Sequence, residues 1–245
     1  MLAAATFALL MAGGMIKGVI GIGLPVIAIP VLTLLIGLPQ AVSVVTLPLI
    51  AANAWQVWQF RHSDDPVRMT SFVVAGGLGI IVGTWVLTTV PAALLEAALG
   101  ILLLVYLFQR LLQPQLRLSR ARARQLAEPV GFAAGVLQGS TGLAGPIGIT
   151  YFHAMGLSRA EFIRCSGIMF LGFTLVQIVS LQQAGLMTLQ ALTLGLVALP
   201  GTAIGLWIGN AIAGWLPPRF FDRLVLIVLG WTSGSLLWGV GQGWL

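Results

Sequence analysis

The chain has 245 residues, of which 58% are hydrophobic and only 7% are charged, whereas a soluble domain carries roughly 25% charged residues. This composition excludes an ordinary soluble domain and predicts that most of the chain lies in a bilayer, in apolar runs of about 20 residues. The runs do not alternate in polarity as β-barrel strands do, so the expected fold class is an all-α polytopic membrane protein.

The net charge of +6 does not predict binding to nucleic acid, because the basic residues sit mainly in short loops. Seven of the twelve fall in two segments: Arg61 and Arg68, then Arg110, Arg117, Arg120, Arg122 and Arg124. That distribution follows the positive-inside rule of membrane proteins. The single cysteine, Cys165, excludes an internal disulfide and a cysteine-cluster metal site. We expect neither a metal nor a cofactor.

Residues 3–36 are uncharged apart from Lys17. At about 1.5 Å per residue, this run is too long for one simple span. We expect a span that is broken near Gly21–Pro25 and continues as a shorter helix to Ile36. Three further spans are expected, at residues 41–60, 69–89 and 91–112. Pro91 suits the first helical position of the last of these, where its missing N–H costs nothing.

The polar segment 113–128 is interpreted as an Arg-rich linker between two repeated halves, residues 1–112 and 129–245. Spans are expected in the second half at residues 129–155, 161–181, 187–213 and 217–240, giving about eight in total. Both termini then lie on the linker's side of the membrane, which the arginines place in the cytoplasm. If each broken segment is a hairpin, the parity changes and the repeats are inverted rather than parallel.

A glycine-rich stretch occurs twice, at residues 13–30 and 135–150. The two copies align Gly14 with Gly135, Gly18 with Gly139, Gly21 with Gly142, Pro25 with Pro146, and Lys17 with Gln138. Glycine and proline inside a span are costly unless the freed backbone groups line a cavity enclosed by protein. Matching interruptions in two halves therefore indicate the binding site of a transporter.

Lys17 is the only lysine, and at membrane depth a charge marks a candidate site. The alternative interpretation is that the Lys17 side chain extends to the membrane–water interface. N–H groups freed at the breaks suit an anion. The expected substrate-binding residues at the breaks are Lys17, Gly21, Gly23, Pro25, Gln138, Ser140, Thr141, Gly142, Gly145 and Pro146. Close helix packing is the other reading of the glycines, and the one expected for Gly201, Gly205 and Gly209.

Asn53, Gln56 and Gln177 are polar residues inside spans, where they either face the pore or bond to neighbouring helices. Arg164 either binds a tetrahedral oxyanion, which suits a guanidinium, or anchors its helix at the interface. Asn53, Gln56 and Arg164 join the candidate substrate-binding residues. The chain lacks the H-E-x-x-H, G-x-S-x-G and Walker motifs, and no enzymatic activity is expected.

Three motifs together resemble the TauE/SafE family, the sulfite exporter family of membrane transporters. They are G-x-x-G-x-G-L-P at residues 18–25, a G-L-P/S turn at 37–39 and again at 156–158, and G-x-x-Q-G-S-T-G-x-x-G-P at 135–146. The resemblance covers nearly the whole chain. It implies a multi-pass protein of the bacterial inner membrane and a sulfur-containing anion such as sulfite, thiosulfate or an organosulfonate. Other members relay thiosulfate through cysteines, so with Cys165 alone a non-reactive oxyanion is expected.

The expected function is secondary transport of sulfite or a small organosulfonate such as sulfoacetate, bound near mid-membrane between the breaks. A passive anion channel and a non-transporting membrane subunit remain as alternatives. The expected partners are the anion and the lipid bilayer, without nucleic acid. The oligomeric state stays open, a homodimer included.

Overall fold

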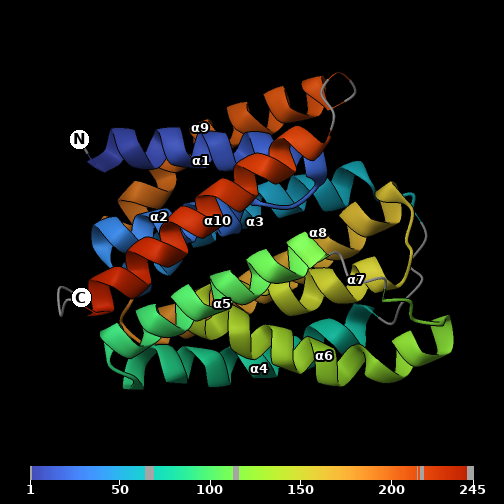
Figure 1. Ribbon diagram of the computed structural model, residues 1–245, viewed down its shortest axis with the longest axis horizontal. Helices are drawn as coiled ribbons and strands as arrows, with labels where there is room; N and C mark the ends of the chain where they lie inside the picture. The colour runs from blue at the N-terminus through green and yellow to red at the C-terminus, as the bar shows by residue number, and fades with distance from the viewer. Residues whose placement is uncertain (1, 64–68, 113–115, 214, 216–217, 242–245) are drawn as a thin grey trace.

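The computed structural model describes residues 2–63, 69–112, 116–213, 215 and 218–241, and over these residues the chain is helical without strands. Arg68, Pro217 and linker residues 113–115 lie outside the described residues. Figure 1 shows the helices running along one common direction. The elements are α1 (Leu2–Ile20), α2 (Leu24–Ile36), α3 (Leu38–Gln59), α4 (Met69–Thr89), α5 (Ala92–Leu112), α6 (Arg120–Thr141), the π-helix η1 (Gly145–Ile149), α7 (Thr150–Ala154), α8 (Arg159–Gln183), α9 (Leu189–Ile212) and α10 (Pro218–Gly241).

Six of the described helices, α1, α3, α4, α5, α8 and α9, are long and apolar enough to cross a membrane. Two shorter apolar helical segments, α2 and residues 225–239 of α10, accompany them. Large side chains such as Trp85 and Trp207 are 65% and 74% exposed, as lipid-facing residues would be. The expected multi-pass helical membrane architecture is therefore confirmed.

The first break turns the chain back on itself. A Cβ atom placed on Gly13 would lie 3.3 Å from the Cα atom of Leu24, whereas a continuous helix would separate these residues by about 16 Å. Gly21 and Gly23 adopt φ angles of 85° and 123°, which side chains disfavour. The expected break near Gly21–Pro25 is confirmed, and α1 and α2 form a hairpin.

The second break also reverses the chain. α6 ends where Gly142 takes a left-handed conformation, and its N–H donates to the carbonyl oxygen of Gln138 at 2.7 Å. After the turn, a Cβ atom placed on Gly148 would lie 3.7 Å from the Cβ atom of Ala134, so η1 runs back along α6. Residues 129–155 are thus a second hairpin rather than one span.

α6 begins earlier than the span that we expected from residue 129. Ser119 caps its first turn by accepting a hydrogen bond from the N–H of Arg122 at 3.4 Å, as serine commonly does at this position. Residues 120–128 of the Arg-rich segment are therefore helical. Because α6 carries these charges, it is not among the helices that are apolar enough to count as a span.

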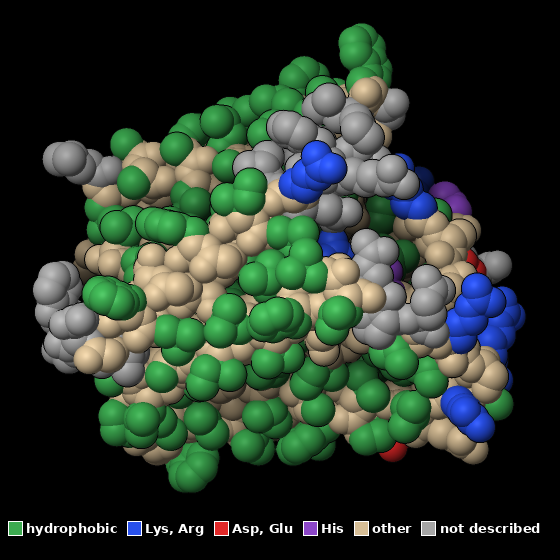
Figure 2. All heavy atoms as spheres, in the orientation of Figure 1, with side chains coloured by type: hydrophobic (Ala, Val, Ile, Leu, Met, Phe, Trp, Pro, Cys, Tyr) green, Lys and Arg blue, Asp and Glu red, His purple; other side chains and the backbone are tan. Residues whose placement is uncertain are grey.

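The two hairpins place the linker and the helical ends Leu2 and Gly241 at opposite ends of the bundle (Figure 1). Our expectation that the linker shares a side with the termini is wrong, because each hairpin adds a reversal. Arginine and lysine side chains gather towards the linker end (Figure 2). Three hydrogen bonds join elements there: Arg159 Nη2 to Val19 O at 3.1 Å, Leu118 N to Ala154 O at 2.7 Å, and Arg164 to Ser63 O.

Glycines bring α1 against α9 and α4 against α6, each pair joining a helix before the linker to one after it. A Cβ atom on Gly205 would collide with the carbonyl oxygen of Met11, and one on Gly79 with that of Phe132. Such backbone contact is typical of small-residue packing in membranes. It confirms the packing interpretation of Gly201, Gly205 and Gly209, and extends it to Gly135 and Gly139.

Candidate functional site

Lys17 is enclosed beside the first break and is 1% exposed. Its Nζ donates to Asn53 Oδ1 at 2.8 Å and to the carbonyl oxygen of Gly21 at 3.4 Å. Asn53 lies on α3, and its Nδ2 donates to the carbonyl oxygen of Leu49 at 2.7 Å. The ring centroid of Phe170 on α8 lies 5.7 Å from Nζ. Lys17 therefore does not reach an interface, and the oxygens that it bonds are neutral.

Gln56 lies next to Lys17 and carries an unsatisfied acceptor. Its Nε2 donates to the carbonyl oxygen of Lys17 at 3.4 Å. Its Oε1 is buried and has no hydrogen-bond partner within the described part of the chain. A buried polar atom without a partner costs about 1–3 kcal/mol, so this oxygen is available to a donor that arrives with a ligand.

A corresponding cluster at the second break is complete. Gln177 Nε2 donates to the carbonyl oxygen of Gln138 at 3.0 Å, and the two residues are 39 positions apart, as are Gln56 and Lys17. Gln138 Nε2 donates to Gln177 Oε1 at 3.0 Å, and Gln138 Oε1 accepts from the N–H of Ala144 at 3.0 Å. Both side chains are thus engaged in holding the turn, with no charge present.

The two breaks meet near Gly145 and Val26. A Cβ atom placed on Gly145 would lie 3.9 Å from Cγ2 of Val26, which lies in the first turn of α2. Pro25 and Pro146 occupy the first turns of α2 and η1, and neither helix start has a side-chain cap. Gly21 faces Ile163 and Gly142 faces Val42, each from the other half. Apolar side chains therefore cover both turns.

The other polar residues expected at the site donate to backbone carbonyl oxygens. Ser140 Oγ donates to the carbonyl oxygen of Val136 at 2.9 Å, and Thr141 Oγ1 to that of Leu137 at 2.7 Å. Thr141 Oγ1 also accepts from the N–H of Leu143 at 3.3 Å. Arg164 donates to the carbonyl oxygen of Ser63 at the linker end. No hydrogen bond within the described part of the chain joins these residues to Lys17.

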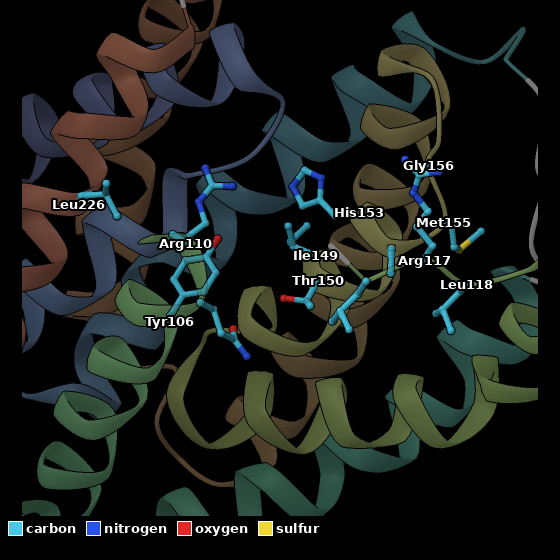
Figure 3. A pocket seen from close by; sticks show the side chains of 13 residues that line it. Tyr106, Arg110, Arg117, Leu118, Ile149, Thr150, His153, Met155, Gly156 and Leu226 are labelled. Carbon is cyan, nitrogen blue, oxygen red and sulfur yellow. The ribbon is translucent and has the colours of Figure 1, made fainter. Parts of the chain in front are cut away.

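Sequence reasoning missed a cavity of about 810 Å³ at the linker end (Figure 3). Polar residues from three separate segments line it: Tyr106, Gln109 and Arg110 of α5, Arg117 of the linker, and Thr150 and His153 of α7. His153 stacks on Phe162 with 4.5 Å between ring centroids. The only sequence signal was the position of Arg110 and His153 near the ends of their apolar runs.

A model of the family described as "Sulfite exporter TauE/SafE" matches residues 6–236. The chain belongs to this family. Neither the curated proteins nor the solved structures include a match to it.

Membership in the TauE/SafE family confirms the family resemblance drawn from the glycine motifs. It also identifies the class of protein, because the family consists of transporters rather than enzymes and implies a small anion as substrate. In this TauE/SafE chain, Lys17 is a buried cationic side chain beside the first break.

Proposed function

We propose that this protein is a secondary transporter of sulfite or an organosulfonate such as sulfoacetate, bound near mid-membrane at the first break. The observation that carries the proposal is Lys17, which is buried and whose hydrogen-bond partners among the described residues are neutral oxygens. A cation at membrane depth is expensive. An arriving anion relieves that cost by pairing with Nζ, which gives the site its selectivity for negative charge.

The neighbouring groups have distinct parts in this proposal. Asn53 holds the lysine side chain towards α3. Gly21, Gly23 and Pro25 shape an uncapped start of α2, whose positive dipole end favours an anion. The unpaired Oε1 of Gln56 accepts a hydrogen bond from the O–H group of a hydrogensulfite ion, whereas a fully ionised sulfonate has no donor for that oxygen. We therefore propose hydrogensulfite as the preferred form of the substrate.

The two halves, residues 1–112 and 129–245, act in the proposal as inverted repeats. Support comes from the paired hairpins, from the equal 39-residue separations of the two glutamine contacts, and from the exchanged packing of α1 on α9 and α4 on α6. In alternating access, one repeat moves against the other around the site. Gln138, Ser140, Thr141, Gly142, Gly145 and Pro146 then form a neutral wall that faces the Lys17 site.

The orientation follows from the clustered arginines. The linker end is cytoplasmic by the positive-inside rule, and both termini face the opposite side of a bacterial inner membrane. Arg159 and Arg164 lie at the same end of the bundle as the linker. A parallel arrangement of eight spans would instead place these two arginines on the side opposite the linker, so the inverted arrangement fits the positive-inside rule better.

Flux into proteoliposomes tests the function. Purified protein is expected to move sulfite with saturable kinetics and to show counterflow when the vesicles are preloaded, and sulfoacetate and sulfate serve as competing anions. Flux that does not saturate and shows no counterflow would identify a passive channel. An absence of flux from folded protein would identify a non-transporting subunit.

A further inference from the structure

The cavity at the linker end is lined by α5, by the linker residues just before α6, by the end of η1 with α7 and the turn after it, and by Leu226 of α10. In Figure 3, Arg110 and Tyr106 project from one side of the open space, and His153 and Thr150 lie on the other. Arg117 comes from the linker and lies near Met155 and Gly156 in this view. Among the described residues that line the cavity, two carry guanidinium groups and none carries a carboxylate.

The inner lining is polar as well as basic. Gln109 Oε1 is buried and lacks a hydrogen-bond partner in the described structure. Thr150 Oγ1 donates to the carbonyl oxygen of Pro146, at 2.7 Å, and so ties the cavity wall to the second break. Guanidinium groups match the geometry of oxyanions, and such a lining suits a small hydrated oxyanion better than an apolar molecule.

Tyr106 separates the cavity from the place where the two breaks meet. It is 4% exposed, and a Cβ atom placed on Gly145 would lie 3.9 Å from both its Cζ and its hydroxyl oxygen. The same Cβ atom would lie 3.9 Å from Val26 of α2. One aromatic side chain therefore stands between a basic, open cavity and the turn of each half.

We propose that this cavity is a second anion site, a vestibule that collects the oxyanion through Arg110 and Arg117, with Tyr106 as the closing wall towards the breaks. This inference rests on the proposed transport function for its biological role. Binding of sulfite in the cavity can nevertheless be measured separately from transport. Basic residues at the mouth of a site raise the local concentration of an anion.

Equilibrium binding of sulfite tests the vestibule. The protein is placed in phosphatidylcholine nanodiscs, and binding is measured by calorimetry for wild type, for Arg110→Gln/Arg117→Gln, and for Arg122→Gln/Arg124→Gln. The last two variants lose the same charge, and Arg122 and Arg124 are exposed on α6 outside the cavity. We expect the cavity variant to weaken sulfite affinity by about tenfold or more, and the α6 variant to change it less than about twofold.

Transport kinetics distinguish a failure of this inference from a failure of the proposed function. The cavity variant is expected to raise the KM for sulfite while leaving the maximal rate near that of wild type, because Lys17 is unchanged. If wild type binds sulfite through Arg110 and Arg117 but shows no flux, the transport proposal fails and the vestibule stands. If transport proceeds with the same KM in both variants, the vestibule is overturned and transport stands.

An anionic lipid headgroup is the alternative ligand of this cavity, because it would pair with the same two guanidinium groups. Sulfite binding is repeated in nanodiscs that contain phosphatidylglycerol. Retained affinity supports a soluble oxyanion as the occupant. Loss of sulfite binding in wild type, together with lipid retention that depends on Arg110 and Arg117, would overturn the vestibule and assign the cavity to a lipid headgroup.

Discussion

Lys17 Nζ donates to Asn53 Oδ1 across 2.8 Å, which ties the end of α1 to the C-terminal part of α3 at the first break. The bond holds the only lysine of the chain in a buried position that a membrane protein would avoid without a functional reason. A role of this hydrogen bond in fold stability and a role of Lys17 in anion binding predict opposite results when the two residues are replaced.

Removing Lys17 and Asn53 together should separate stability from binding. In Lys17→Met/Asn53→Leu both partners of the hydrogen bond become apolar, a change that is often nearly neutral or stabilising. We expect a Tm equal to or above that of wild type and a loss of sulfite affinity of about ten- to a hundredfold, corresponding to about 1.5–3 kcal/mol for a charge-assisted bond. A lower Tm with intact affinity would assign the pair to the fold alone.

The two glutamine contacts provide a matched pair of variants. Gln177→Met removes the partner of Gln138 from a complete network, and it should lower stability by about 1–3 kcal/mol. Gln56→Met removes a side chain whose Oε1 has no partner among the described residues, so its effect on stability should be smaller, while sulfite affinity falls. Thermal unfolding and calorimetry on both proteins measure this. Equal destabilisation with equal binding would contradict the asymmetry of the two breaks.

Substitution of Gly205 should act on helix packing. A valine there would meet the carbonyl oxygen of Met11, and backbone cannot yield as a side chain does, so we expect a loss of at least about 1–3 kcal/mol. Gly234→Val on α10 is the control, because a Cβ atom there has open space. Detergent-solubilised yield and Tm report the difference. Similar losses in the two variants would indicate helix propensity rather than packing.

Cysteine labelling tests the direction of the hairpins. Ala121 lies on α6 at the linker end, and Ala184 follows α8 at the opposite end; both are exposed. In a Cys165→Ala background, an impermeant thiol reagent should label Ala184→Cys in intact spheroplasts and Ala121→Cys only in inside-out vesicles. Eight parallel-repeat spans would place both positions on the cytoplasmic side, so labelling of both from that side alone would refute the inverted arrangement.

The amino-acid sequence by itself determined the membrane-helical class, the two broken segments, the packing glycines of α9 and the unusual lysine. Each of these follows from local chemistry: apolar length, the backbone freedom of glycine, and the cost of a charge in lipid. The starts and ends of most spans were also predictable, because polar residues and proline interrupt the apolar runs.

Only the tertiary structure decided that each break is a hairpin. Glycine at Gly21 and Gly142 permits a turn in more than one direction, and the packing of α2 along α1 and of η1 along α6 selects one. That choice moved the linker to the end opposite the termini. It also brought Arg110, Arg117 and His153 around one cavity. Residues from separate segments become neighbours through contacts between helices, which local patterns do not encode.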